Sequence, residues 1–268
     1  MKLNTVMATR NPCYQANRSI RPAGIMVHST GANNPNLRRY VQPDDGFLGR
    51  NPNNNSFNEP GKTVCVHAFI GRLLDGSIAT YQILPWTRRG WHCGSGRAGS
   101  GNNTHISFEI CEDNLGDAAY FAAVYKEAVE FCAYLCKLYA LDPARDGVLI
   151  CHSEGHARGI ASNHGDVMHW FPRHGRTMDT FRADVALEMQ NESEDADMPV
   201  IYKTLDDVPA WGRAAVEQVL EMGYLQGDGN GDINLTEDLL RMLVINDRAK
   251  LYGDGAAPAE LDFADESG

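Results

Sequence analysis

Four short apolar runs, separated by polar and glycine-rich segments, constrain the fold of this chain most strongly. They are AGIMVHST (23–30), TVCVHAFIG (63–71), THISFEICE (104–112) and GVLICHSEG (147–155). Their length and β-branched content predict buried strands. Residues 117–141 instead have apolar side chains three and four apart, which predicts a helix capped by Asp117, and a second helix is expected at 177–190. Strands that alternate with helices predict an α/β fold with a central mixed β-sheet flanked by helices.

The acidic residues gather in the last third of the chain, which predicts two units with different tasks. Residues 191–268 hold 5 of the 24 Lys+Arg and 18 of the 35 Asp+Glu, so they carry −13 and residues 1–190 carry +2. We expect one domain at 1–190, an acidic linker at 191–200, a small all-α module at 201–253 and a disordered tail at 254–268. Neither unit is basic enough to predict nucleic acid as a partner.

The apolar runs are also too short for a membrane span, which needs about 18 residues. Residues 1–22 lack the apolar stretch of a secretory signal. We therefore expect a protein that is made in the cytoplasm without a signal peptide.

Two of the apolar runs end in a histidine, His28 in VHST and His152 in CHSE. Ligands of α/β sheets bind at strand ends. A catalytic zinc takes three protein ligands and leaves one position open, so these histidines and one residue of 162–175 would form such a site. That stretch, SNHGDVMHWFPRHG, offers His164, Asp166, His169 and His174. The alternative is a pair of hydrogen-bonded sheet histidines.

Several motifs between residues 20 and 188 follow the order found in one enzyme family. They are VHST, HAFIGRLLDG, GWHCG, GNNTHISFEIC and CHSEGHARGIASNHGDVMHWF. In these motifs the chain resembles the zinc-dependent N-acetylmuramoyl-L-alanine amidases of type 2, which share their fold with T7 lysozyme and the peptidoglycan recognition proteins. It is similar above all to phage and prophage endolysins. The resemblance implies a catalytic amidase domain at 1–190 with the type 2 amidase fold.

The resemblance also implies a zinc ion and its ligands. The family's first two ligands follow the first and the last core strand, which are His28 and His152 here. The third is a Cys or Asp in a downstream loop, and HGDV makes Asp166 that ligand, with His169 as the competing candidate. Val167 stands where the family usually has proline.

Further site residues follow from the same resemblance. Glu109 in SFEIC matches a glutamate beside the zinc-bound water, and we expect it to act as general base and acid. His164 stands where a lysine is common, and it is expected to stabilise the oxyanion. Trp91 and His92 in GWHCG, and His67 in VHAF, are expected to contact substrate. A solvent-facing strand glutamate, and core packing for Trp91 and His67, are the alternatives.

Residues 204–253 resemble a single S-layer-homology-like repeat, with an aspartate-rich start, Trp211, GYLQGDGNG and a helix that contains an arginine. Such modules bind cell-wall polymers, and a dimerising or purely structural helical hairpin is the alternative. The segment DGNGDINLTEDL also spaces oxygen side chains as a calcium loop does, although Ile233 replaces the required glycine. The residues so spaced are Asp228, Asn230, Asp232 and Asn234.

These interpretations predict a peptidoglycan hydrolase that cleaves the amide between N-acetylmuramic acid and the L-alanine of the stem peptide. We expect a phage or prophage endolysin that reaches the wall after release by lysis. Its partners would be peptidoglycan, a secondary cell-wall polymer at residues 201–253 and, if that module dimerises, a second copy of the chain. A non-catalytic peptidoglycan-binding protein on the same fold and a zinc peptidase acting on stem peptides are the alternatives.

Overall fold

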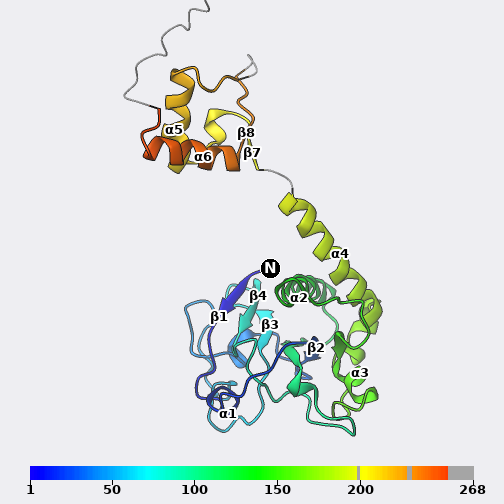
Figure 1. Cartoon of the computed structure of the whole chain (residues 1–268). Coiled ribbons are helices and arrows are strands. Elements are labelled where there is room, and N and C mark those ends of the chain that lie inside the picture. The colour runs from blue at the N-terminus through cyan, green and yellow to red at the C-terminus, as the bar shows by residue number, and fades with distance from the viewer. Residues whose placement is uncertain (198–199, 228–230, 253–268) are drawn as a thin grey trace, which may run out of the picture. The chain divides into compact units, whose positions relative to one another are not determined.

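The computed structural model describes residues 1–197, 200–227 and 231–252 (Figure 1). The chain divides into two compact units, the first spanning Met1–Glu192 and the second beginning at Ser193. The predicted tail at 254–268 lies outside the described residues. Within the described ranges, no helix has the length and apolar character needed to cross a membrane.

Six strands form one mixed sheet in the first unit, in the order β1-β4-β3-β5-β2-β6. β3 and β4 pair antiparallel, and the other neighbouring strands pair parallel. The four predicted runs supply β2, β3, β5 and β6, so the predicted central mixed sheet is confirmed. The strand bounds are β1 Leu3–Thr5, β2 Gly24–Ser29, β3 Ala68–Arg72, β4 Ile78–Gln82, β5 His105–Ile110 and β6 Leu149–Cys151.

Four α-helices accompany this sheet: α1 (Pro12–Gln15), α2 (Ala118–Tyr139), α3 (His152–Ala157) and α4 (Met178–Asp197). The carboxylate of Asp117 accepts a hydrogen bond from the Tyr120 N–H and so caps α2, as the sequence predicts. The segment directly after β6 forms α3, and α4 extends through residues 191–197, where the sequence predicts an acidic linker.

The two faces of the sheet carry different side chains because strand residues alternate in direction. On β5, Ile106, Phe108 and Ile110 point into the main core, which α2 covers (Figure 1). His105, Ser107 and Glu109 alternate with them and lie on the other face. Part of that face is covered by the loop segment 31–63, which packs a second apolar cluster against β3 and β4. The face of β2 and β5 that carries His28 and Glu109 borders a cavity instead.

In its described residues, the second unit contains two α-helices and a short strand pair. These are α5 (Ala210–Glu221), α6 (Glu237–Arg248), β7 (Ile201–Tyr202) and β8 (Leu235–Thr236). A Cβ on Gly212 would come within 2.6 Å of the Leu240 side chain, so the glycine lets α5 approach α6 closely. The module predicted as all-α therefore contains a two-residue β-ladder as well.

Candidate metal centre

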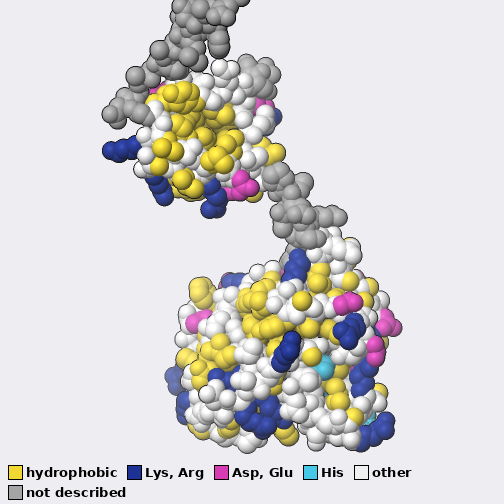
Figure 2. Space-filling view, viewed as in Figure 1, with side chains coloured by type: hydrophobic (Ala, Val, Ile, Leu, Met, Phe, Trp, Pro, Cys, Tyr) yellow, Lys and Arg dark blue, Asp and Glu magenta, His cyan; other side chains and the backbone are white. Residues whose placement is uncertain are grey.

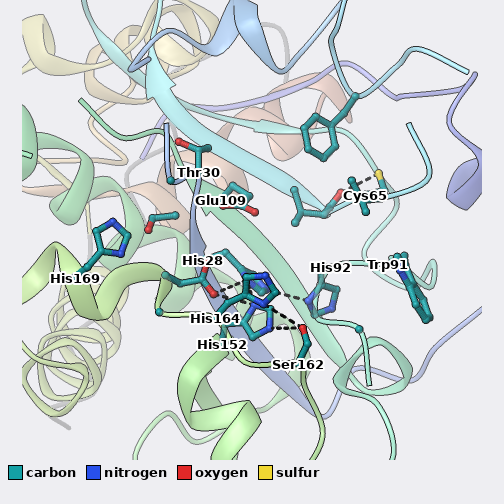
Figure 3. A pocket seen from close by; sticks show the side chains of 18 residues that line it. His28, Thr30, Cys65, Trp91, His92, Glu109, His152, Ser162, His164 and His169 are labelled. Carbon is teal, nitrogen blue, oxygen red and sulfur yellow. Dashed lines mark hydrogen bonds and ion pairs between the residues drawn. The ribbon is translucent and has the colours of Figure 1, made fainter. Parts of the chain in front are cut away.

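Three side chains converge at the carboxyl end of the sheet (Figure 3). His28 lies in β2, His152 is the first residue of α3 directly after β6, and Asp166 begins a short 3-10 helix. The Nδ1 atoms of His28 and His152 are 3.2 Å apart. Asp166 Oδ2 lies 3.4 Å from the first of these nitrogens and 2.9 Å from the second. The structure thus brings together the two histidines and the aspartate that the resemblance names as ligands.

The spacing of these three atoms suits a tetrahedral metal ion. Zinc bonds of 2.0–2.1 Å at tetrahedral angles place neighbouring ligand atoms about 3.3 Å apart, close to the distances found here. Asp166 Oδ2 is buried and has no hydrogen-bond partner of suitable geometry, although two ring nitrogens face it. Among the described residues, His28, His152 and Asp166 are the one metal-capable group of this kind. Two imidazole nitrogens and a carboxylate oxygen are donors that zinc accepts, so these residues fit a zinc ion.

The backbone of Asp166 has an unusual conformation at the point where its carboxylate faces His28 and His152. Its φ of +42° lies in the left-handed region, which costs a non-glycine residue roughly 1–2 kcal/mol. The following residue, Val167, is fully buried in the main core and anchors the turn. Burial raises the pKa of the Asp166 carboxyl, but the facing rings of His152 and His28 outweigh it and hold that pKa below its ordinary value. The carboxylate is therefore ionised and turned toward the histidines.

Two other metal-capable residues of 162–175, His169 and His174, are held elsewhere. His169 Nε2 lies 3.0 Å from Oε1 of the buried Glu112, which also accepts a hydrogen bond from the Gly31 N–H. His174 stacks on Phe121 with ring centroids 4.1 Å apart. The geometry therefore favours Asp166 over His169 as the third ligand. Nothing in the sequence pattern marked Glu112 as the residue that holds His169.

Glu109 lies beside the metal-capable group on the neighbouring strand. It is the register partner of His28, so both side chains are on the same face of the sheet. Its Oε2 atom is buried with no hydrogen-bond partner in the described part of the chain, and Glu109 lines the cavity. Burial raises the pKa of the Glu109 carboxyl well above its ordinary value, and the charges of Asp166 and Glu112 raise it further. A carboxylate whose pKa is raised binds a proton more strongly than an ordinary glutamate does.

The hydroxyl group of Ser162, which the sequence motifs did not indicate, links His164 to His152. Ser162 Oγ is 3.1 Å from His164 Nδ1 and 3.3 Å from His152 Nε2, and it donates to the Cys93 carbonyl at 3.2 Å. The ring centroids of His164 and His152 are 4.7 Å apart. Within the described part of the chain, the hydrogen bonds of His164 use Nδ1, which leaves Nε2 for the cavity.

The three predicted substrate contacts have different surroundings. Trp91 is 40% exposed at the cavity, and the Arg89 guanidinium lies 5.1 Å from its ring centroid. His92 also lines the cavity, and its Nδ1 is 3.0 Å from His28 Nε2. His67 is fully buried, with Nε2 2.7 Å from the Arg88 carbonyl oxygen, and burial lowers its pKa to about 4. The placement of His67 does not support the predicted contact with substrate.

An open cavity of about 590 Å³ lies beside His28, His152 and Asp166 (Figure 3). Phe57, Val64 and Trp91 give part of its wall an apolar character, and Val64 and Trp91 are well exposed. His28, His152, Asp166 and Glu109 supply its polar side. An apolar wall around a few convergent polar groups is the usual form of a site for an organic substrate.

The second unit contains a cavity of its own, of about 440 Å³, beside α5 and α6. Figure 2 shows hydrophobic side chains gathered on the visible face of this unit. Trp211 (48% exposed) and Ile245 (64% exposed) line the cavity together with Arg241 and Arg248. The Arg241 guanidinium lies 5.8 Å from the Trp211 ring centroid. The cavity thus combines an exposed aromatic surface with two guanidinium groups.

The predicted calcium ligands Asp228 and Asn230 lie outside the described residues. Asp232 forms an ion pair with Lys203 at 3.2 Å. The calcium interpretation therefore gains no support from the described part of the loop.

Comparison with known proteins identifies relatives of this chain. A curated relative, N-acetylmuramoyl-L-alanine amidase CwlH of Bacillus subtilis (strain 168), is 51% identical over 44 residues, which are 16% of this chain and 17% of that protein's length. The solution structure of the PlyG catalytic domain matches with a TM-score of 0.51 at 21% identity, covering 70% of this chain and 96% of that one. Staphylococcus aureus hydrolase AmiA, in complex with its ligand, matches with a TM-score of 0.50 at 17% identity, covering 72% and 84%. Likenesses at this level of identity concern the fold.

The family itself is identified over more than half of the chain. Residues 18–173 match the sequence model of the family described as N-acetylmuramoyl-L-alanine amidase (Amidase_2). This range contains His28, His152 and Asp166, together with Glu109. The chain therefore belongs to the N-acetylmuramoyl-L-alanine amidase family.

Proposed function

We propose that this protein is a zinc-dependent amidase of peptidoglycan, acting as an endolysin. It would hydrolyse the amide between the lactyl group of N-acetylmuramic acid and the L-alanine of the stem peptide. The observation that carries the proposal is the triangle of His28 Nδ1, His152 Nδ1 and Asp166 Oδ2 at 2.9–3.4 Å, beside a cavity, in a member of this family.

His28, His152 and Asp166 are the residues that would hold the zinc. When bound, zinc supplies Lewis-acid polarisation of the amide carbonyl and lowers the pKa of water. Asp166 contributes one negative charge to the site, and two neutral imidazoles contribute none. The protein ligands therefore leave the site with a net positive charge, which favours a developing oxyanion.

Glu109 is proposed to move the proton. Its Oε2 atom has no protein hydrogen bond to give up, and its raised pKa suits a group that must both take and return a proton. Glu109 would accept a proton from the attacking water as the C–O bond forms. It would then give that proton to the alanine nitrogen as the C–N bond breaks, so that an amine leaves.

His164 and Trp91 are proposed to act on the substrate. Ser162 Oγ donates its hydrogen to the Cys93 carbonyl, so His164 Nδ1 donates to Ser162 Oγ. In the imidazolium form, His164 would also carry an Nε2–H that donates to the oxyanion in the cavity. Trp91 presents its exposed ring at the cavity, where an indole face suits a sugar ring. The Arg89 guanidinium over the ring helps to hold the indole in place.

The proposed reaction is tested by the bond that is cut. Digestion of purified walls is expected to release N-terminal L-alanine without new reducing sugar ends, and chelation of the metal is expected to stop the reaction until zinc is restored. New N-termini other than L-alanine would indicate a peptidase. Walls that bind the protein but release nothing would indicate a binding protein on the same fold.

The second unit is proposed to bind a secondary cell-wall polymer as an S-layer-homology-like module. Support comes from the cavity beside α6, where an exposed Trp211 ring lies near Arg241 and Arg248. Aromatic rings stack on sugars, and guanidinium groups pair with carboxylates or phosphates. Because the unit around this cavity is acidic, these arginines would give local rather than general attraction to an anionic glycan.

Replacing Trp211 with alanine is expected to weaken binding of the full chain to isolated walls about tenfold, because a well-placed aromatic contact contributes roughly 1.4 kcal/mol or more. Cosedimentation with walls, under chelation so that they stay intact, measures this. Met242→Ala is the matched control, since Met242 is exposed on α6 without lining the cavity. Unchanged wall binding together with loss of a dimer in Trp211→Ala would assign this face to self-association instead.

A further inference from the structure

The two ligand histidines face the proposed metal position with the same ring atom. Both present Nδ1 to Asp166. A neutral imidazole has one nitrogen with a lone pair and one that carries a proton. If Nδ1 binds a metal ion, Nε2 of the same ring must carry the proton and needs an acceptor. In metal sites such an acceptor fixes both the tautomer and the orientation of the ring.

The structure contains an acceptor for each ring. His152 Nε2 lies 3.3 Å from Ser162 Oγ, which in turn donates its hydrogen to the Cys93 carbonyl. His28 Nε2 lies 3.0 Å from His92 Nδ1, and the two rings meet edge to face, with planes at 76° and centroids 5.1 Å apart. This geometry lets His28 Nε2 donate to His92 Nδ1 when His92 carries its own proton on Nε2, a buried nitrogen that has no hydrogen-bond partner among the described residues.

His92 is held in place by its own backbone. Its N–H donates to Asn102 Oδ1 at 2.7 Å, and the next N–H, of Cys93, donates to the same oxygen at 3.2 Å. Asn102 is fully buried, and its Nδ2 atom donates to the Gly94 carbonyl. The asparagine therefore fixes the backbone from which the His92 ring reaches His28.

We propose that His92 is a positioning residue for the metal centre: its Nδ1 accepts the Nε2 hydrogen of His28 and so keeps His28 Nδ1 unprotonated and directed at the metal. The proposal rests on the proposed zinc site. It assigns His92 a different role from the substrate contact expected from the sequence. The opposite tautomer, with a proton on His92 Nδ1, would place the His28 proton on Nδ1 and block the ligand atom.

Three variants of His92 distinguish the effect of losing the acceptor atom Nδ1 from the effect of losing the volume of the ring. In His92→Asn the side-chain oxygen can occupy the position of Nδ1, whereas in His92→Gln the amide reaches the position of Nε2. His92→Ala removes both. Zinc affinity, measured by competition with a chromogenic chelator, is expected to fall about 10- to 100-fold in His92→Ala and His92→Gln. In His92→Asn it is expected to stay within about threefold of wild type.

A second readout follows the tautomers directly. In wild type loaded with zinc, ring ¹⁵N chemical shifts are expected to show His28 and His92 each protonated on Nε2. Observation of a proton on His92 Nδ1 in the loaded protein would overturn the proposal. Circular dichroism and thermal unfolding check that each variant is folded. If His92→Ala does not fold, the asparagine and glutamine variants decide.

The outcomes distinguish this inference from the function on which it rests. Wild type that binds no zinc would remove the proposed metal centre and the positioning role together. Wild type that binds zinc, with equal affinity in all three variants, would overturn the positioning role alone. A raised KM at saturating zinc with unchanged zinc affinity would return His92 to the role of substrate contact.

Discussion

Replacing Asp166 with alanine is expected to abolish stoichiometric zinc binding and to lower wall hydrolysis by about 10³-fold or more. In the proposed zinc site, the carboxylate would supply one of the three ligand atoms and the single negative charge among them. Loss of a catalytic metal removes several kcal/mol of transition-state stabilisation, and each 1.4 kcal/mol corresponds to a tenfold change in rate. Metal content of the purified variant and the rate of L-alanine end-group release measure the two effects.

The matched control for this variant is His169→Ala. His169 is the nearest sequence competitor of Asp166, but its Nε2 is bound to Glu112 at 3.0 Å. His169→Ala should therefore keep its zinc and lose activity only to the extent that His169 contacts substrate at the cavity. The reverse result, with zinc lost in His169→Ala and kept in Asp166→Ala, would show that the ligand assignment is wrong.

Replacing Glu109 with glutamine is expected to lower kcat roughly 10²- to 10⁴-fold while zinc stays bound, which is the usual contribution of a general acid–base group. Glutamine has nearly the same shape but cannot carry a proton between water and the leaving amine. The melting temperature of the metal-free protein should not fall, because burying a neutral amide costs less than burying a carboxylate. Single-turnover rates, zinc content and thermal unfolding measure these three quantities.

Glu127→Gln is the control for a buried glutamate outside the site. Glu127 is 8% exposed, accepts a hydrogen bond from Thr80 and, like Glu109, has a pKa raised chiefly by burial. Its replacement should leave kcat unchanged and lower the melting temperature. If Glu109→Gln keeps full kcat, Glu109 is not the proton carrier. If Glu109→Gln loses its zinc, Glu109 contributes to metal binding, and its role as proton carrier is not supported.

The fold class could be predicted from the sequence because it depends on local periodicity. The apolar runs at 23–30 and 104–112 became β2 and β5, and the three- and four-residue spacing of 117–141 became α2. Local signals are weaker where a glycine interrupts the pattern. Residues His152–Ala157 form α3 although they include Gly155, which lies against the Met26 side chain, where a Cβ would come within 3.0 Å of it.

The sequence by itself determined which side chains were available and which strand ends carried them. His28 and His152 follow apolar runs, and parallel strands bring their carboxyl ends to the same edge of a sheet, so a shared site was foreseeable. Only the tertiary structure supplies the observations that favour Asp166 over His169, namely a left-handed backbone angle at Asp166 and the buried Glu112 beside His169. Both are long-range consequences of packing.

The same holds for the atoms that orient the ligands. His28 and His92 are 64 residues apart, and His28 and His152 are 124 apart. No local pattern relates them, since their contact arises from strand order, register and the asparagine that fixes the His92 segment. Residue types and periodicity specify the chemistry that a chain can perform, and the packed backbone selects which nitrogen and oxygen atoms meet to perform it.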